Sequence, residues 1–242
     1  MVSNVARKRP LWLTLLGFAC LVGFGIGAYL ALVVSPPDAN QGYLIKIMYA
    51  HVSVAWICFA AVAISAVFGM LYLWRGRPQD DVRALANAEA ALVFSFLTVT
   101  GGMIYSKPTL NTFWTWDAKL TLTALMVALI VGYFLVRALI DDPQRRGRVS
   151  AVVMIVVLVS LPFNYLAAEW FRTLHPAKSI NLDGSGVSMD SSMLIILLIN
   201  IAVAGLIYLF LVSERIRIGR TVVAKRQARE PAPVSSEVVR VG

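Results

Sequence analysis

The sequence predicts an all-α membrane protein with six transmembrane helices and both termini in the cytoplasm. The first observation behind this prediction is composition. Of the 242 residues, 59% are hydrophobic and 14% are charged, whereas a soluble domain carries about 25% charged residues. The mean hydropathy is +0.74. The chain lacks the polar residues to cover a water-facing surface, which excludes a soluble enzyme, a disordered chain and a disulfide scaffold.

The second observation is a set of six apolar stretches. A bilayer core about 30 Å thick needs about 20 apolar residues in a helix, and each stretch is long enough. We expect the spans at residues 11–34, 50–74, 84–105, 120–140, 149–168 and 193–212. The basic residues before the first span resemble the start of a signal peptide, but the apolar run is too long and no cleavage site ends it.

The third observation is the distribution of basic residues, which sets topology because cytoplasmic loops are enriched in Lys and Arg. If both termini are cytoplasmic, 17 of the 22 basic residues fall on the cytoplasmic side. We therefore expect a membrane domain at residues 1–213 and a basic, flexible cytoplasmic tail at 214–242. The net charge of +9 suits loops beside anionic lipid, so we expect contact with membrane lipid and no nucleic-acid binding.

The chain has only two histidines, and the topology places both at the outer membrane surface. His51 lies near the outer end of the second span, and His175 follows the outer end of the fifth. Either one alone is readily explained as an interfacial residue hydrogen-bonded to a neighbour. Cys20 and Cys58 lie in apolar runs and form no Cys-x-x-Cys pattern, so the chain offers no redox pair, zinc site or covalent haem site.

The connection at about residues 107–121, between the third and fourth spans, is expected on the outer side and is unusually aromatic. It holds Phe113, Trp114 and Trp116 within four residues and then Asp117. These aromatics have two interpretations. Trp and Tyr favour the membrane interface and form belts there, whereas a dense cluster next to an acid suits a platform for a flat apolar ligand.

Three acids near the membrane have ordinary interpretations. Asp117 begins the fourth span, where a carboxylate caps free amides and offsets the helix dipole. Glu89 lies within the third span, and we expect it to snorkel or to pair with Arg83. Glu169 precedes Trp170 and either orients His175 or faces a partner protein.

Taken together, the two imidazoles and the aromatic connection suggest a site for haem, a planar and largely apolar metal complex. Histidine is a usual axial ligand of haem iron, so His51 and His175 are the candidate metal ligands. Four basic residues on the outer side are candidates to pair with the haem propionates, and none is favoured over the others: Lys107, Lys119, Arg172 and Lys178.

At these residues the chain resembles the CcmC family of haem-handling proteins of cytochrome c maturation, within the wider tryptophan-rich "WWD" family. Residues 49–52 are similar to the first histidine motif of the family, and residues 107–108 with 114–121 to its tryptophan-rich segment. Residues 161–162, 169–170 and 173–175 are similar to its second histidine motif. The order and spacing of three rare motifs makes chance a poor explanation.

The chain also departs from the family pattern, which usually reads Trp-Gly-x-Trp-Trp-x-Trp-Asp. Leu110, Asn111 and Phe113 replace the first Trp, the Gly and the next Trp. Phe113 keeps a stacking face but loses the indole donor. The contact with haem at this segment is therefore expected to differ, and Leu110 and Asn111 are not carried over as ligand contacts.

The resemblance implies a function. Proteins of this family hold haem between two axial histidines at the outer, periplasmic face of the bacterial inner membrane and deliver it to the haem chaperone CcmE. The small subunit CcmD and the ATP-driven pair CcmA and CcmB assist. Here the ligands would be His51 and His175, with Trp114, Trp116 and Asp117 as the platform. The bound haem would be transient and non-covalent, and the protein would not itself be an enzyme.

Two other functions stay open from the sequence. One is a haem lyase-type enzyme of the wider WWD family, although those relatives look larger and carry more histidines. The other is a structural subunit of an ABC-type exporter that binds no haem and uses its aromatics only as a belt. The chain has no Walker motif, so it supplies no ATPase activity in either case.

Overall fold

The apolar runs form helices because a backbone inside a bilayer satisfies its N–H and C=O groups within one segment only as a helix. The computed structural model describes residues 9–175 and 189–228, and within these ranges it contains helices and no strand. All six helices are long and apolar enough to cross a membrane, which confirms the predicted all-α fold with six spans, while the cytoplasmic placement of both termini stays a prediction. They are α1 (Leu11–Tyr29, continued by the π-helical segment η1, Leu30–Val34), α2 (Ile45–Arg75), α3 (Pro78–Leu110), α4 (Ala118–Leu139), α5 (Pro143–Trp170) and α6 (Ser191–Gln227).

Several helices run beyond the predicted apolar spans. α3 continues through Pro108 and ends at Asn111, which adopts the left-handed conformation with a φ of 56°. α6 continues to Gln227, so the predicted boundary at residue 213 falls inside a helix. Residues 229–242 lie outside the described ranges, and the flexible tail stays a prediction.

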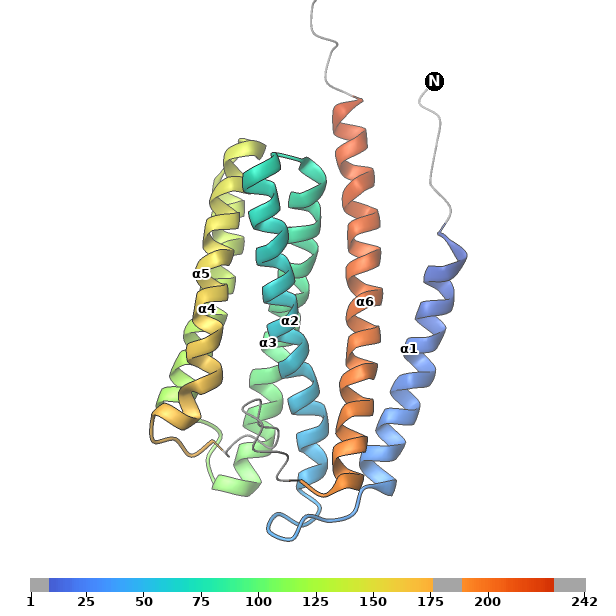
Figure 1. The fold of residues 1–242 in the computed structure, drawn as a ribbon, viewed down its shortest axis with the longest axis vertical. Coiled ribbons are helices and arrows are strands. Elements are labelled where there is room, and N and C mark those ends of the chain that lie inside the picture. Colours follow the sequence, from blue (N-terminus) through green and yellow to red (C-terminus); the bar gives the residue numbers. More distant parts are fainter. Residues whose placement is uncertain (1–8, 176–188, 229–242) are drawn as a thin grey trace, which may run out of the picture.

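The helices alternate in direction along the chain (Figure 1). α2, α3, α4 and α5 pack together, α6 packs against α2 and α3, and α1 packs on α6 at the edge. One buried apolar cluster contains residues from all five helices from α2 through α6, with Phe94, Met126 and Tyr133 among its members. A second, smaller cluster lies around Tyr49 and Leu197.

Two short turns connect the helices at one end of the bundle. Gly76, with a φ of 63°, ends α2, and Pro78 opens α3 two residues later. Asp142 caps α5 by accepting a hydrogen bond of 2.6 Å from the backbone N–H of Arg145. The start of α1 and the end of α6 lie at the same end of the molecule (Figure 1), so the described residues of the three longer connections lie at the other end.

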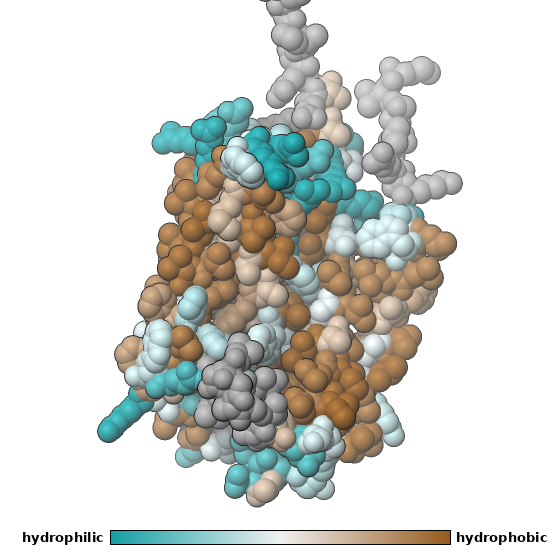
Figure 2. Space-filling model, in the orientation of Figure 1, coloured by the Kyte–Doolittle hydropathy of each residue, from teal (hydrophilic) through white to brown (hydrophobic). Residues whose placement is uncertain are grey.

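The end with the short turns is rich in charged residues, and Figure 2 shows hydrophilic side chains gathered there above a hydrophobic band. Arg137 of α4 forms a two-bond ion pair with Asp81 of α3, at 2.7 and 2.9 Å. Arg215 of α6 likewise binds Glu89 of α3. These pairs join helices rather than neighbours on one helix.

Of the two expectations for Glu89, snorkelling or pairing with Arg83, the pairing with Arg83 is wrong. Arg83 binds Asp80 at 3.0 Å, three residues before it on α3, and the carboxylate of Glu89 is taken by Arg215. Adjacent helices lie close enough for a guanidinium on α6 to reach this depth of α3, whereas Arg83 is closest to its own first turn.

We expect Gly147→Ala to lower the free energy of unfolding by about 1–3 kcal/mol, the usual effect of overpacking. A Cβ on Gly147 would lie 2.4 Å from Cε1 of Tyr72, whose side chain is buried. The matched control is Gly25→Ala on α1, where a Cβ meets nothing within 4 Å and the better helix propensity of Ala is neutral or stabilising. Thermal unfolding in detergent measures both, and equal shifts in the same direction would contradict the tight α2–α5 contact.

Candidate functional site

The predicted site residues all lie at the end of the bundle that carries the longer connections. His51 is in the second turn of α2. Phe113, Trp114, Trp116 and Asp117 lie between α3 and α4, and the described chain after α5 ends at His175. The alternation of the helices brings these segments to one end (Figure 1), as the sequence predicted.

The imidazole of His51 packs against the backbone of α3 at Gly101 and Gly102. Its Nδ1 atom is buried and has no hydrogen-bond partner of acceptable geometry among the described residues, although the backbone at Thr98 is close enough to act on the ring. The side chains of His175 and Lys119 lie near enough to interact electrostatically with this imidazole. The two histidines, 124 positions apart in the sequence, are thus electrostatic neighbours in the fold.

Asp117 joins the tryptophan connection to the segment that carries His175. Its carboxylate caps α4 by accepting a hydrogen bond of 3.0 Å from the N–H of Leu120, which confirms the predicted capping role. It also accepts a hydrogen bond of 3.2 Å from the N–H of Leu174, the residue before His175. A third bond, of 3.1 Å, comes from the hydroxyl of Thr115.

These hydrogen bonds set the charge of Asp117. Burial on its own raises the pKa of a carboxyl group, but the N–H groups of Leu120 and Leu174 and the hydroxyls of Thr173 and Thr115 outweigh it. They hold the pKa of Asp117 below its ordinary value. The group is therefore a carboxylate at neutral pH, able to accept all of these bonds.

The aromatic side chains of the connection differ in exposure. Trp114 is half-buried, and its Nε1 is buried without a hydrogen-bond partner among the described residues. Trp116 is 77% exposed and meets Trp114 edge to face, with ring centroids 5.6 Å apart and an interplanar angle of 76°. Phe113 is exposed, with the ammonium of Lys107 5.3 Å from its ring centre. The two indoles thus present crossed faces rather than one flat shelf.

The basic candidates for the haem propionates differ in their surroundings. Lys119 turns into the bundle, where its ammonium donates to the backbone oxygen of Asn164 at 2.6 Å and to Oδ1 of the same residue at 3.1 Å. Lys107 donates to the backbone oxygen of Asn111 at 3.3 Å. Arg172 is exposed on the segment after α5, and Lys178 lies outside the described residues.

Three residues near the site were not singled out from the sequence. Asn164 is 2% exposed and links α5 to α4 through Lys119 and through a 3.0 Å hydrogen bond to Thr123. A polar amide in an apolar span is a signal that could have found it. Gly101 and Gly102 form an adjacent glycine pair in the third span, which was the only sequence signal of a close approach there.

This arrangement suits a metal that arrives already chelated. In the described part of the chain, no group of three or more His, Cys, Asp or Glu residues could hold a bare metal ion. Haem iron brings four ring nitrogens and needs only one or two axial ligands. Two imidazoles beside exposed aromatic side chains match that requirement.

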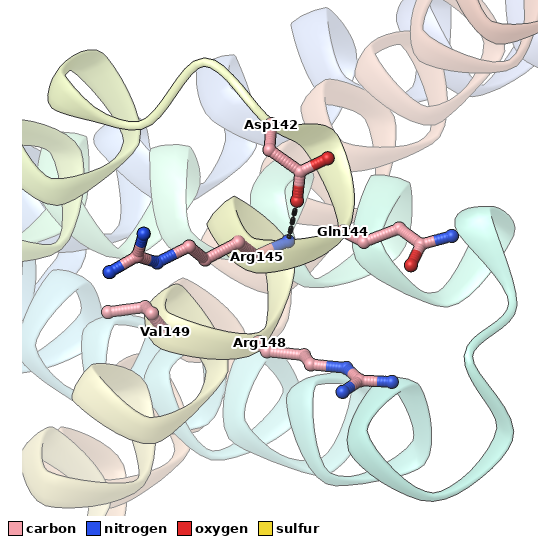
Figure 3. Close-up of a pocket in the computed structure, with 5 residues that line it drawn as sticks. All are labelled: Asp142, Gln144, Arg145, Arg148 and Val149. Atoms are coloured by element: carbon pink, nitrogen blue, oxygen red, sulfur yellow. Dashed lines mark hydrogen bonds between the residues drawn. The ribbon is translucent and has the colours of Figure 1, made fainter.

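A hollow of about 340 Å³ lies at the start of α5, at the end of the bundle opposite to the predicted site, and Figure 3 shows the residues that line it. It is lined by Asp142, Gln144, Arg145, Arg148 and Val149. Figure 3 shows the carboxylate of Asp142 occupied by the N–H of Arg145, with the two guanidiniums directed to different sides. It contains no histidine and no aromatic residue, so it is not the predicted site.

Six helices long and apolar enough to cross a membrane, with two histidine-bearing segments on either side of a Trp–Asp connection in the sequence, define the class as a polytopic α-helical membrane protein. Comparison with known proteins identifies the particular family. The sequence model of the CcmC family, described as heme exporter protein C, matches residues 2–232. The chain belongs to this family, which confirms the resemblance seen in the sequence.

Individual relatives agree with the family assignment. The chain is 33% identical to the heme exporter protein C of Bradyrhizobium diazoefficiens over 82% of its own length and 73% of the relative. It is 29% identical to the Escherichia coli K12 protein of the same name, over 66% of the chain and 65% of the relative, just under two thirds. A putative ccmC-like mitochondrial protein of cytochrome c biosynthesis from Arabidopsis thaliana is 29% identical over 72% of the chain and 65% of that protein.

We expect Asp117→Ala to loosen the segment before His175. Loss of a helix cap lowers stability by about 1 kcal/mol, and here the N–H of Leu174 also loses its acceptor. Hydrogen exchange in detergent should therefore speed up at Leu174. Asp142→Ala is the matched control, because it removes a similar cap at the opposite end of the bundle and should leave exchange at Leu174 unchanged. Unaltered exchange at Leu174 in Asp117→Ala would show that the hydrogen bond between Asp117 and the N–H of Leu174 does not hold this segment.

The stabilisation that the hydrogen bonds of Asp117 provide should also be lost in acid. A carboxyl group whose pKa is lowered by folding stabilises the fold at any pH above its unfolded pKa of about 4. That contribution is lost as the pH falls through the lower pKa of the folded protein. The difference in unfolding midpoint between wild type and Asp117→Asn should thus be constant from about pH 5 to 7 and shrink below about pH 4. A difference that grows in acid would mean that the pKa is raised.

Proposed function

We propose that this protein binds haem at the outer, periplasmic face of the bacterial inner membrane and delivers it to the haem chaperone CcmE during cytochrome c maturation. His51 and His175 would hold the iron, and Phe113, Trp114 and Trp116 would contact the macrocycle. The observation that carries the proposal is the hydrogen bond of 3.2 Å from the N–H of Leu174 to Asp117, which holds the chain before His175 beside the tryptophan connection. The side chain of His175 also lies near enough to His51 for the two to interact electrostatically.

Two buried polar atoms support a ligand at this place. Nδ1 of His51 and Nε1 of Trp114 have no hydrogen-bond partner among the described residues. An unsatisfied buried polar group costs about 1–3 kcal/mol, so such groups are expected where a ligand or an ordered water completes the site. Both atoms belong to residues that the sequence had already assigned to haem.

The exposure of the site suits transfer rather than storage. Trp116 and Phe113 are exposed, and the described residues that lead from α5 to His175 lie at the same end of the bundle. Haem is the cargo here, so the site has to release it to a partner. A ligand set open to the outer side lets a partner imidazole or aromatic residue approach while the first ligands still hold.

The orientation in the membrane follows from charge. The positive-inside rule assigns the end with the two short turns, the start of α1 and the end of α6 to the cytoplasm. The site then faces the periplasm, and residues 214–242 form a cytoplasmic basic segment beside anionic lipid. The chain would work with CcmD and the CcmA–CcmB transporter, without enzymatic activity of its own and without nucleic acid.

The test is the absorption spectrum of the purified protein in detergent, beside that of the His51→Ala/His175→Ala variant. We expect a Soret band in the wild type that is lost in the variant, and loading of CcmE that falls by more than about tenfold, as loss of metal ligands predicts. Trp74→Phe is the control for the aromatic residues, because Trp74 is exposed at the opposite end of α2. It should behave as wild type, whereas Trp114→Phe should bind haem more weakly.

Other outcomes point to the other functions. Undiminished loading of CcmE by the double variant would overturn the ligand assignment. Absence of a Soret band in the wild type, even with added haem and reductant, would indicate a structural subunit with a tryptophan belt. Covalent attachment of haem to apocytochrome by this chain alone would indicate a lyase.

A further inference from the structure

We infer that Gly101 and Gly102 form a strip without side chains on α3 that sets the orientation of the His51 imidazole, so that Gly102 is a positioning residue for the ligand. This inference rests on the proposed function, because it concerns how His51 meets the iron. It adds a residue of α3 to a site otherwise built from α2 and the two connections.

The strip lies directly against the ring. A Cβ on Gly102 would lie 3.0 Å from Cε1 of His51, 3.5 Å from Nδ1 and 3.8 Å from Nε2. A Cβ on Gly101 would lie 3.6 Å from Nδ1 and 3.7 Å from Cβ of His51. The distance of 3.0 Å from a Cβ on Gly102 to Cε1 is shorter than ordinary van der Waals contact, whereas the distances of 3.6 and 3.7 Å from a Cβ on Gly101 are ordinary contacts. The ring therefore fills the space that a side chain at 102 would need.

The contacted atom matters for ligation. Cε1 is bonded to both ring nitrogens, so a displacement of Cε1 moves whichever nitrogen binds the iron. The ring has no hydrogen bond from Nδ1 to fix it among the described residues, unlike most metal-binding histidines, whose second nitrogen is held by a partner. Besides the backbone at Thr98, the ring lies against the backbone of α3 at Gly101 and Gly102, which limits its rotation.

The two glycines weaken the helix in which they lie, but they allow the His51 side chain to approach its backbone closely. Glycine is a poorer helix former than Ala in a helix interior, and these two lie more than a turn from the end of α3. In membrane helices, small residues allow close approach of neighbouring backbones. Here the approaching group is a titratable, metal-binding side chain rather than an apolar one.

The first test uses the protein without haem. Gly102→Ala should lower the unfolding midpoint in detergent by a few degrees, because the new Cβ meets Cε1. In a His51→Ala background the same substitution should raise the midpoint, since the obstacle is gone and Ala favours the helix. A decrease of equal size in both backgrounds would show that Gly102 does not act through His51, and would overturn the inference.

The second test measures haem binding across a graded series. Gly132→Ala on α4, where a Cβ meets nothing within 4 Å, should leave the affinity and the midpoint potential of the bound haem unchanged. Gly101→Ala should stay within about twofold of wild type, and Gly102→Ala should weaken binding about tenfold, as loss of a positioning contact does, with a shifted midpoint potential. The effects should increase in the order Gly132, Gly101 and Gly102, because a Cβ at position 132 meets nothing within 4 Å, one at 101 lies 3.6 Å from the His51 ring and one at 102 lies 3.0 Å from it.

The outcomes separate the two proposals. Wild-type affinity and potential in Gly102→Ala, with haem binding still dependent on His51, would overturn the positioning role and leave the proposed function intact. Haem binding with wild-type affinity in variants at both His51 and Gly102 would overturn the proposed function itself. In that case a sign reversal in the haem-free unfolding test would still establish the Gly102–His51 contact.

Discussion

The geometry of the site depends on one hydrogen-bonded carboxylate. Asp117 starts α4 and at the same time accepts the N–H of Leu174, 57 residues later in the chain. The first bond fixes the tryptophan connection to a rigid helix, and the second fixes the chain before His175 to that same point. A single side chain therefore converts two connections into one unit. Because its hydrogen bonds favour the charged form, the unit is held by charge-assisted bonds, which are stronger than neutral ones.

The two ends of the bundle divide the work of folding and binding. At one end, ion pairs join α3 to α4 through Asp81 and Arg137, and α3 to α6 through Glu89 and Arg215. Charged groups at such depth are costly unless paired, so each pair favours one packing of the helices. The other end has the imidazoles and the two indoles, of which Trp116 is exposed, and there Nδ1 of His51 and Nε1 of Trp114 have no hydrogen-bond partner among the described residues. The ion pairs that join the helices thus lie at the end opposite to the one where we propose that the ligand binds.

The sequence predicted the fold class, the approximate spans and the end of the bundle where His51, the tryptophans and His175 meet, because hydropathy and helix alternation are enough for that. It did not predict that Arg215 takes Glu89, or that Lys119 binds Asn164. These contacts depend on how each helix is rotated about its axis. A membrane helix that is apolar on every side has no amphipathic pattern to reveal that rotation. The capping role of Asp117 was predictable because it is local, whereas its bond to Leu174 required the packed bundle.

The contact between His51 and the glycine pair is another contact that only the packed bundle reveals. It bears on how haem would be held. A transfer protein has to bind its cargo firmly enough to capture it and loosely enough to release it. A histidine fixed by a strong hydrogen bond from its second nitrogen would be a firm, basic ligand. Under the proposed function, a ligand restrained largely by packing against the backbone at Gly101 and Gly102 would keep its direction without that added ligand strength. Orientation and affinity would then be set by different features of the fold, as reversible delivery requires.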